Sequence, residues 1–216
     1  MRRVNLILGF VCAFLVLPLA AKADSIDFNA VGPGGFTWAG GLGSTLTATG
    51  STVTAQMVPG GSLIALTGAL SFTTGGYVSG FSLFGQTGYG FSSGGDVTVS
   101  GCGGTCFSGA FTGGQLLFNA AGSTATFTGN FIAGQLDASL LALLGFPSGT
   151  STDATGSLSA SFLLNGGLSD SSGGTGSWTS GDLTLTPSPV PEPPTLSLLG
   201  VGLIAAGTIS KKLIAR

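Results

Sequence analysis

One pattern occurs twice in this chain, as FSGAFTGGQL at positions 107–116 and as FTGNFIAGQL at positions 127–136. Successive side chains of a β-strand point to opposite faces, so the two phenylalanines of each copy would share one face of a strand. The glycine before each glutamine, Gly114 or Gly134, would then lie at or near a turn. The offset of 20 positions fits two strides of a meander, which predicts that both copies run in the same direction.

The rest of the body shows the alternation of polar and apolar residues that is typical of strands. It includes TLTAT at 45–49, DVTVS at 96–100 and DLTLT at 182–186, each with a period of two. Glycine-containing breaks, mostly about ten residues apart, supply the turns of an antiparallel sheet. We therefore predict an all-β body that forms an antiparallel meander or β-sandwich, with a β-roll or solenoid as the alternative that the repeat favours. The segment Ala138–Leu144 fits a helix or a buried strand equally well.

Charged residues are distributed unevenly along the chain. No lysine or arginine lies between Lys22 and Lys211, and the chain has no histidine. Of the eight acidic residues one is Glu192, and the others are the aspartates Asp24, Asp27, Asp96, Asp137, Asp153, Asp170 and Asp182. Between Asp24 and Pro189 the charge at neutral pH is therefore about −7.

This charge pattern excludes several function classes. Without cations the body cannot neutralise phosphates, so we expect no nucleic-acid partner. Without an imidazole it has no acid–base group near pH 7, and we predict that it is not an enzyme. Carboxylates and loop carbonyls are the ligands that calcium prefers, but most of these aspartates adjoin glycine or serine, where Asp forms turns. We therefore predict no metal site and no cofactor.

Aromatic residues are numerous enough to form a core. Thirteen of the 15 phenylalanines lie in the body, together with Trp38, Trp178, Tyr77 and Tyr89. Burial of one such side chain contributes roughly 1.5–3 kcal/mol, which favours a folded body over a disordered one. The tryptophans and tyrosines have two interpretations. They pack in the core, which we favour, or they form exposed platforms on which sugars stack.

The N-terminus has the layout of a secretory signal peptide. It reads Met1-Arg2-Arg3, then an apolar run over 4–19, and then Ala21-Lys22-Ala23. Positive start, apolar middle and small-x-small exit are the three parts of such a signal. The apolar run of about 16 residues is shorter than the roughly 20 that a membrane-spanning helix needs. We expect cleavage between Ala23 and Asp24.

Two cysteines remain after removal of the signal peptide, which carries Cys12. They are Cys102 and Cys106, separated by two glycines and a threonine. An even number of cysteines in an exported chain favours a disulfide. The glycines permit the tight turn that brings the two Cα atoms into range. A metal site would need further Cys or His ligands, which the body lacks.

The C-terminus begins with a proline-rich stretch and continues as an apolar segment. Five prolines between 187 and 194 predict an extended linker over 187–195. Apolar and small residues follow from Leu196, and Lys211, Lys212 and Arg216 close the chain. An apolar helix followed by cations stops in a membrane with its basic end inside. We therefore predict one transmembrane helix with a basic tail over 196–216, and a body outside the membrane.

The C-terminal segment also resembles a known sorting signal. Val190, Pro191, Glu192 and Pro193, followed by the apolar segment and the basic end, are similar to the PEP-CTERM sorting signal over 190–216. This resemblance implies export through the secretion machinery, retention in the membrane, and recognition by an exosortase-type enzyme that removes the tail. It also implies a bacterial source that makes exopolysaccharide and biofilm matrix. The bodies of this family are diverse, so the resemblance names no activity.

These inferences divide the chain into four parts. We predict a signal peptide over 1–23, an all-β body over 24–186, a linker over 187–195 and the membrane segment over 196–216. The predicted function is that of an exported, membrane-sorted surface or exopolysaccharide-matrix structural protein without catalytic activity. The alternative is a carbohydrate-binding surface adhesin. The protein would be anchored by its C-terminal helix until processed, and would then lie at the cell surface or in the matrix, with exopolysaccharide as a further partner.

Overall fold

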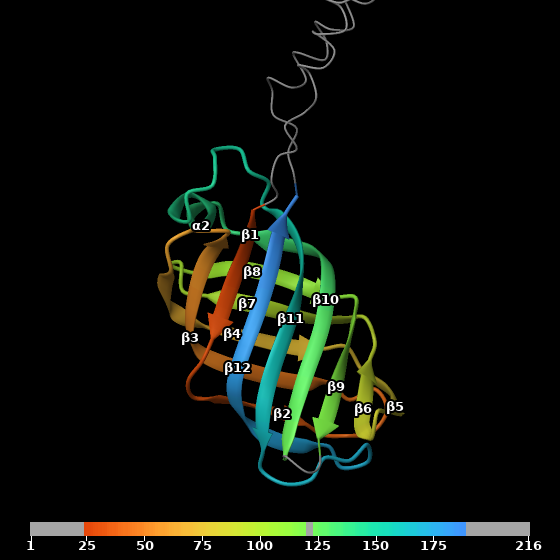
Figure 1. The fold of residues 1–216 in the computed structure, drawn as a ribbon. Helices are drawn as coiled ribbons and strands as arrows, with labels where there is room; N and C mark the ends of the chain where they lie inside the picture. Colours follow the sequence, from red (N-terminus) through yellow and green to blue (C-terminus); the bar gives the residue numbers. More distant parts are fainter. Residues whose placement is uncertain (1–23, 120–122, 189–216) are drawn as a thin grey trace, which may run out of the picture. The chain divides into compact units, whose positions relative to one another are not determined.

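The strands around the repeat form one antiparallel sheet that closes on itself (Figure 1). The computed structural model describes residues 24–119 and 123–188. The elements are β1 (Ser25–Ala30), β2 (Gly34–Trp38), β3 (Leu46–Val58), β4 (Ile64–Thr74), β5 (Tyr77–Leu83), β6 (Gln86–Phe91), β7 (Gly94–Ser100), β8 (Thr105–Phe111), β9 (Gly113–Asn119), β10 (Thr124–Leu136), α2 (Ala138–Leu143), β11 (Asp153–Leu164) and β12 (Gly174–Pro187).

Eight strands form the closed part of the sheet, in the cyclic order β1-β3-β4-β7-β8-β10-β11-β12 and back to β1. Strand β2 follows β1 and lies, like β1, between β12 and β3, while β9, β6 and β5 branch from β10. The all-β prediction is confirmed, and every pairing is antiparallel. The body is a closed barrel rather than an open meander, a sandwich, a roll or a solenoid. The alternation of residues is the same in an open and a closed sheet, so it did not reveal the closure.

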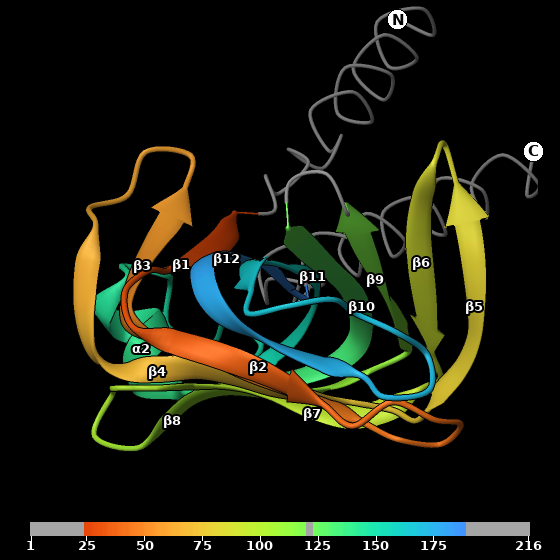
Figure 2. The same cartoon turned by 90° about the horizontal axis from the view of Figure 1, so that it is seen from below.

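The barrel has two layers whose strands cross steeply. Figure 1 shows β1, β12, β11 and β10 in front of β4, β7 and β8, and Figure 2 shows the same layers seen from below. The long strands turn from one layer to the other at irregular positions. In β3 the register shifts between Ser51 and Val53, and Thr52 between them has φ 60°. A bulge of this kind bends a strand and lets it take part in both layers.

The interior of the barrel is filled by aromatic and aliphatic side chains. Phe28, Phe107 and Phe127 are fully buried. The ring centroids of Phe72 and Phe127 lie 4.7 Å apart in a stacked arrangement. Among the described residues the only buried polar side chain is that of Thr74. Its hydroxyl accepts a hydrogen bond from the Leu46 amide and donates one to a carbonyl, so this polar group is satisfied.

The two copies of the repeat pair with each other in opposite directions. Phe107 lies opposite Leu136, and Leu116 lies opposite Phe127, so a local two-fold axis relates the copies. The prediction of a common direction is wrong. The first copy runs through β8 into β9, and both strands pair with β10, which holds the second copy. The amide of Thr112, between β8 and β9, donates to the Asn130 carbonyl at 2.8 Å. Strands β8 and β9 therefore follow one another along the same side of β10.

Glycines of the repeat make room for its phenylalanine rings. A Cβ atom on Gly134 would lie 2.4 Å from the ring of Phe107, and one on Gly114 would lie 2.5 Å from the ring of Phe127. Gly129 lies under two rings at once, because its Cβ would be 2.8 Å from Phe111 and 3.0 Å from Phe127. Gly114 lies at the start of β9 and Gly134 near the end of β10, so both are strand residues close to a strand end. Both are covered by aromatic rings.

A short helix follows the second copy at one end of the barrel (Figure 1). Helix α2 begins after Asp137, whose carboxylate accepts hydrogen bonds from the amides of Ser139 at 2.8 Å and Leu140 at 3.2 Å. Such an N-cap satisfies amides that have no partner in the first turn. Leu140 and Leu141 are buried against the core. Of the two structures considered for 138–144, the helix is therefore the one observed.

The packing of Gly129 predicts the effect of adding a single methyl group. The substitution Gly129→Ala should lower the free energy of unfolding by about 1–3 kcal/mol, because two buried rings must move. Urea unfolding followed by tryptophan fluorescence measures this change. Gly167→Ala is the matched control, since nothing lies within 4 Å of its added Cβ, and it should change stability by less than about 0.5 kcal/mol. Equal effects of the two substitutions would contradict the proposed role of Gly129.

Candidate functional site

The solvent-facing residues of β2, β3, β4, β7 and β12 form a continuous surface of small polar groups, which we call the outer polar face. The residues of this face form rows that run across neighbouring strands, because the strand register places hydroxyl residues side by side. One row consists of Thr175, Thr37, Thr47, Thr73 and Asp96. Within this face the hydroxyls of Thr37 and Thr47 are 2.9 Å apart, and those of Ser71 and Thr98 are 2.8 Å apart. The hydroxyls are thus ordered by bonds to one another.

A shallow depression lies in the outer polar face where β12, β2 and β3 meet. Its volume is about 420 Å³. The polar side chains that line it are Thr37, Thr47, Thr49, Asn165 and Thr175. Gly35 and Gly176 also line it, and a Cβ on Gly35 would lie 2.6 Å from the Gly176 carbonyl oxygen. The depression offers hydroxyl and amide groups without any charge, which suits hydrogen bonding to a neutral polyol better than to an ion.

The tryptophans and tyrosines considered as sugar platforms belong to the core. They are Trp38, Trp178, Tyr77 and Tyr89, each at most 6% exposed. Both indole N–H groups have partners inside the molecule: that of Trp178 donates to the Ala30 carbonyl at 3.1 Å, and that of Trp38 donates to the Ser44 hydroxyl at 2.8 Å. These rings present no free face on which a sugar could stack.

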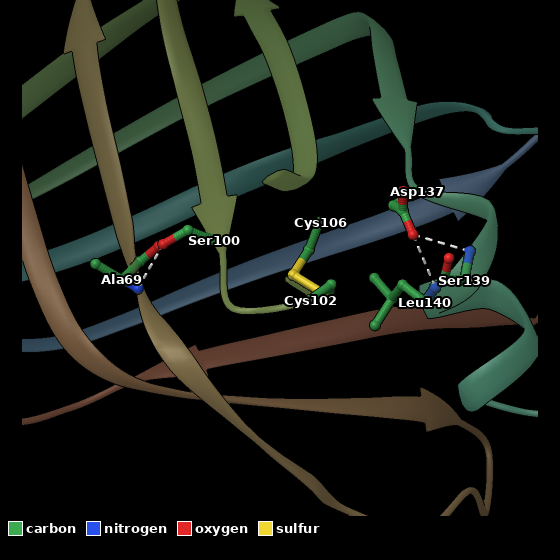
Figure 3. The surroundings of a disulfide bond; sticks show 7 residues. All are labelled: Ala69, Ser100, Cys102, Cys106, Asp137, Ser139 and Leu140. Atoms are coloured by element: carbon green, nitrogen blue, oxygen red, sulfur yellow. Dashed lines mark hydrogen bonds between the residues drawn. A yellow bond between two sulfur atoms is a disulfide. The ribbon is translucent and has the colours of Figure 1, made fainter. Parts of the chain in front are cut away.

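The disulfide between Cys102 and Cys106 is confirmed, with its Cα atoms 5.4 Å apart (Figure 3). It closes the loop between β7 and β8, and Cys106 is fully buried. Two neighbours fix the loop. The Asp137 amide donates to the Cys106 carbonyl at 2.8 Å, and the Ala69 amide donates to the Ser100 hydroxyl at 3.0 Å. The bridge therefore ties the β7–β8 loop to the start of β8, and the backbone of Cys106 contacts the residue that caps helix α2.

The aspartates are spread over the surface, with one close pair. Asp27 on β1 and Asp182 on β12 both lie near the hydroxyl of Thr184, which is 2.8 Å from the first carboxylate and 3.2 Å from the second. Partial burial and then the charge of Asp27 raise the pKa of Asp182, and the hydrogen bond from Thr184 opposes this shift. Within residues 24–119 and 123–188, no three His, Cys, Asp or Glu side chains gather to hold a metal ion.

The remaining sequence-derived site residues lie outside the described part of the chain. These are Ala23 of the cleavage site, the motif Val190, Pro191, Glu192 and Pro193, and the basic residues Lys211, Lys212 and Arg216. Asp24 is the first described residue. None of the helices in the described ranges is long and apolar enough to cross a membrane. The helix predicted for 196–216 lies beyond those ranges.

Comparison with known proteins identifies the C-terminal segment. This segment matches a motif that implies export and sorting at the membrane. Residues 189–212 match the model of the PEP-CTERM protein-sorting motif, which confirms the resemblance seen in the sequence. The motif implies recognition by an exosortase. No curated protein and no solved structure matches the chain, and the body has no recognised family.

The depression in the outer polar face is a site that sequence reasoning missed. Its threonines come from segments far apart in the chain, such as Thr47 and Thr175. The alternation TLTAT at 45–49 placed Thr47 and Thr49 on one face of a strand. Nothing in the sequence showed that β12 would lie beside β2 and bring Thr175 to the same place.

The raised pKa of Asp182 predicts how stability changes with pH. The folded state holds this proton more tightly than the unfolded chain, so the associated stability is complete below the unfolded pKa of about 3.9. It is lost as the pH rises through the folded pKa. Asp182→Asn removes this loss, so the free energy of unfolding of the variant relative to the original protein should increase from pH 3 to pH 7, by less than about 1 kcal/mol at this exposed position.

Thermal unfolding followed by circular dichroism at several pH values measures the difference. The matched control is Asp96→Asn, which removes one carboxylate from β7, a strand that pairs with neither β1 nor β12. A pH-independent difference between Asp182→Asn and the original protein would contradict the assignment.

Proposed function

We propose that this chain is an exported, membrane-sorted structural protein of the bacterial surface or exopolysaccharide matrix, without catalytic activity. The PEP-CTERM motif at 189–212 carries the proposal, because it implies export and sorting by an exosortase. On this view the signal peptide directs export and the C-terminal segment holds the chain in the membrane. The exosortase then removes the tail, and the body remains at the cell surface or in the matrix.

The chemistry of the body supports a role without catalysis. Its side chains include no histidine, lysine or arginine. The acids Asp27 and Asp182 share the Thr184 hydroxyl on the outside of the sheet, and the body has no histidine or lysine that could activate this hydroxyl as a nucleophile. General acid–base catalysis needs a group that titrates near the working pH and faces a bound substrate. The interior of the barrel is occupied by packed aromatic rings, which supports a purely structural use of the core.

The outer polar face supports a place in a hydrated polysaccharide. Its rows of serine and threonine offer many neutral hydroxyls, and the charge of about −7 is carried by aspartates that are spread over several elements. A neutral hydroxylated surface is compatible with a glycan matrix. Hydrogen bonds between the protein and the glycan have free energies similar to those that each of them makes with water. The closed sheet and the disulfide supply rigidity outside the cell, where disulfides persist.

Removal of the sorting segment tests the proposed function. A chain lacking Val190–Arg216 should be exported but no longer retained at the envelope, so that fractionation of the cells finds the body in the medium. Its melting temperature should match that of the retained protein, since the described core lies entirely within residues 26–185. Unchanged retention of a correctly folded body at the envelope would refute the sorting role.

The depression on β12, β2 and β3 supports carbohydrate binding as a second candidate function. Stacking on tryptophan or tyrosine is not open to this body, because those rings are buried. Hydrogen bonds from Thr37, Thr47 and Asn165 would instead hold a neutral sugar in the depression. Such binding would be weak for each sugar unit, because a net hydrogen bond contributes only about 0.5–1.5 kcal/mol.

A substitution of similar shape tests this second candidate. Thr47→Val removes one hydroxyl and should weaken retention on immobilised exopolysaccharide of the producing bacterium by up to about tenfold, the equivalent of 1.4 kcal/mol. Thr155→Val on β11 is the matched control and should leave retention unchanged, because Thr155 does not line the depression. If neither the original protein nor the variants are retained, the adhesin alternative is refuted and the structural proposal stands.

A further inference from the structure

Strand β5 ends the branch of the sheet and pairs with β6 alone (Figure 2). The backbone groups of its first residue, Tyr77, are paired with the loop between β2 and β3. The Tyr77 amide donates to the Ser44 carbonyl at 2.8 Å, and the Gly43 amide donates to the Tyr77 carbonyl at 2.9 Å. Beyond Tyr77, no backbone group of β5 makes a main-chain hydrogen bond outside the β5–β6 ladder to any described residue. Among the described residues, an open row of backbone donors and acceptors therefore extends to Leu83.

Between Ser79 and Leu83 this edge lacks the features by which proteins prevent strand addition. Natural edge strands are protected by charges, prolines, bulges or covering segments. The hairpin Tyr77–Phe91 contains no charged residue and no proline. Its register is irregular only between Tyr77 and Ser79, and from there to Leu83 the pairing with β6 is regular. The part that is open is thus also the part whose geometry permits a further strand.

The hairpin also exposes apolar side chains. Phe84, at its tip, is 97% exposed, and Val78 and Leu83 are about half exposed. We call the open backbone of Val78–Leu83, together with these exposed apolar side chains, the β5 edge. Pairing with another strand along this edge would satisfy the backbone groups and cover part of the apolar surface, and both effects favour association.

We propose that the β5 edge is where a second copy of this chain pairs, strand to strand and antiparallel, about a two-fold axis. Such an interface is self-complementary, so one edge serves both copies. Charge favours this occupant. All aspartates of the body lie outside Tyr77–Phe91, so pairing here brings no like charges together across the seam. A cationic partner would instead be attracted to the surfaces that carry the aspartates.

The open stretch also defines the register. The loop at Gly43 and Ser44 blocks Tyr77, which leaves Ser79–Leu83 free to pair over its full length. A two-fold axis that uses the whole stretch passes through Phe81, so that Gly80 of one copy lies opposite Ser82 of the other. The chain already contains such an arrangement, because its internal repeat pairs with itself antiparallel about a local two-fold axis.

A single engineered thiol tests this proposal in the full-length chain in intact cells of the producing bacterium. In a Cys12→Ala background, Ser82→Cys provides a free thiol, since Cys102 and Cys106 are joined to each other. The two introduced thiols would be diagonal neighbours across the seam, roughly 7–8 Å apart, within reach of a short bis-maleimide. We expect a product of twice the chain mass, at least fivefold more abundant than with Thr155→Cys on β11, which pairs on both sides.

A second substitution separates edge pairing from association through other parts of the chain. Ser79→Glu, added to the Ser82→Cys chain, should reduce the cross-linked product at least fivefold, because the body has no cation to pair with the new carboxylate. Thr155→Glu in the same background should not reduce it. Equal products from Ser82→Cys and Thr155→Cys, a product with other host proteins only, or no effect of Ser79→Glu would each overturn the proposal. None of these outcomes bears on the sorting role, which the deletion tests separately.

Discussion

The contact between glycine backbone and phenylalanine ring is the constraint on which the closed sheet depends. Nine phenylalanines are buried in the described core, and several of their rings occupy space that a Cβ atom on a neighbouring glycine would fill. Glycine loses more conformational freedom on folding than any other residue. Here that cost is offset because Gly114, Gly129 and Gly134 allow the rings of Phe107 and Phe127 to approach the backbone closely.

The absence of cations from the body determines what its surface can be. With seven aspartates and no opposite charge, no ion pair can form within the described residues. Order on the outside comes instead from hydroxyl pairs such as Thr37 with Thr47, and from the strand register that places them together. Where two carboxylates do meet, partial burial of Asp182 and then the charge of Asp27 raise the pKa of Asp182, so the fold loses stability as the pH rises through that pKa. Neutral polar residues avoid this cost.

The sequence was sufficient to predict what depends on local pattern. Alternation predicted the strands, the spacing of Cys102 and Cys106 predicted the disulfide, and the Pro-Glu-Pro segment predicted the sorting motif. It did not predict what depends on pairing between distant segments. The predicted common direction of the two repeats was wrong, because β8 and β9, joined through Thr112, both pair antiparallel with β10. The depression was missed because Thr175 reaches Thr37 only through the register of β12 with β2.

The repeat explains both why the sheet closes and why one edge stays open. Strand β10 pairs with β9 from Thr124 to Asn130 and then with β8 from Gly134 to Leu136, on either side of a register shift in its pairing with β11. At this shift the partner strand divides. The β8 half continues to β7 and completes the closed sheet, whereas the β9 half leads outward to β6 and β5. A closed sheet has no edge, so the free edge of β5 arises from this division of one strand's partner.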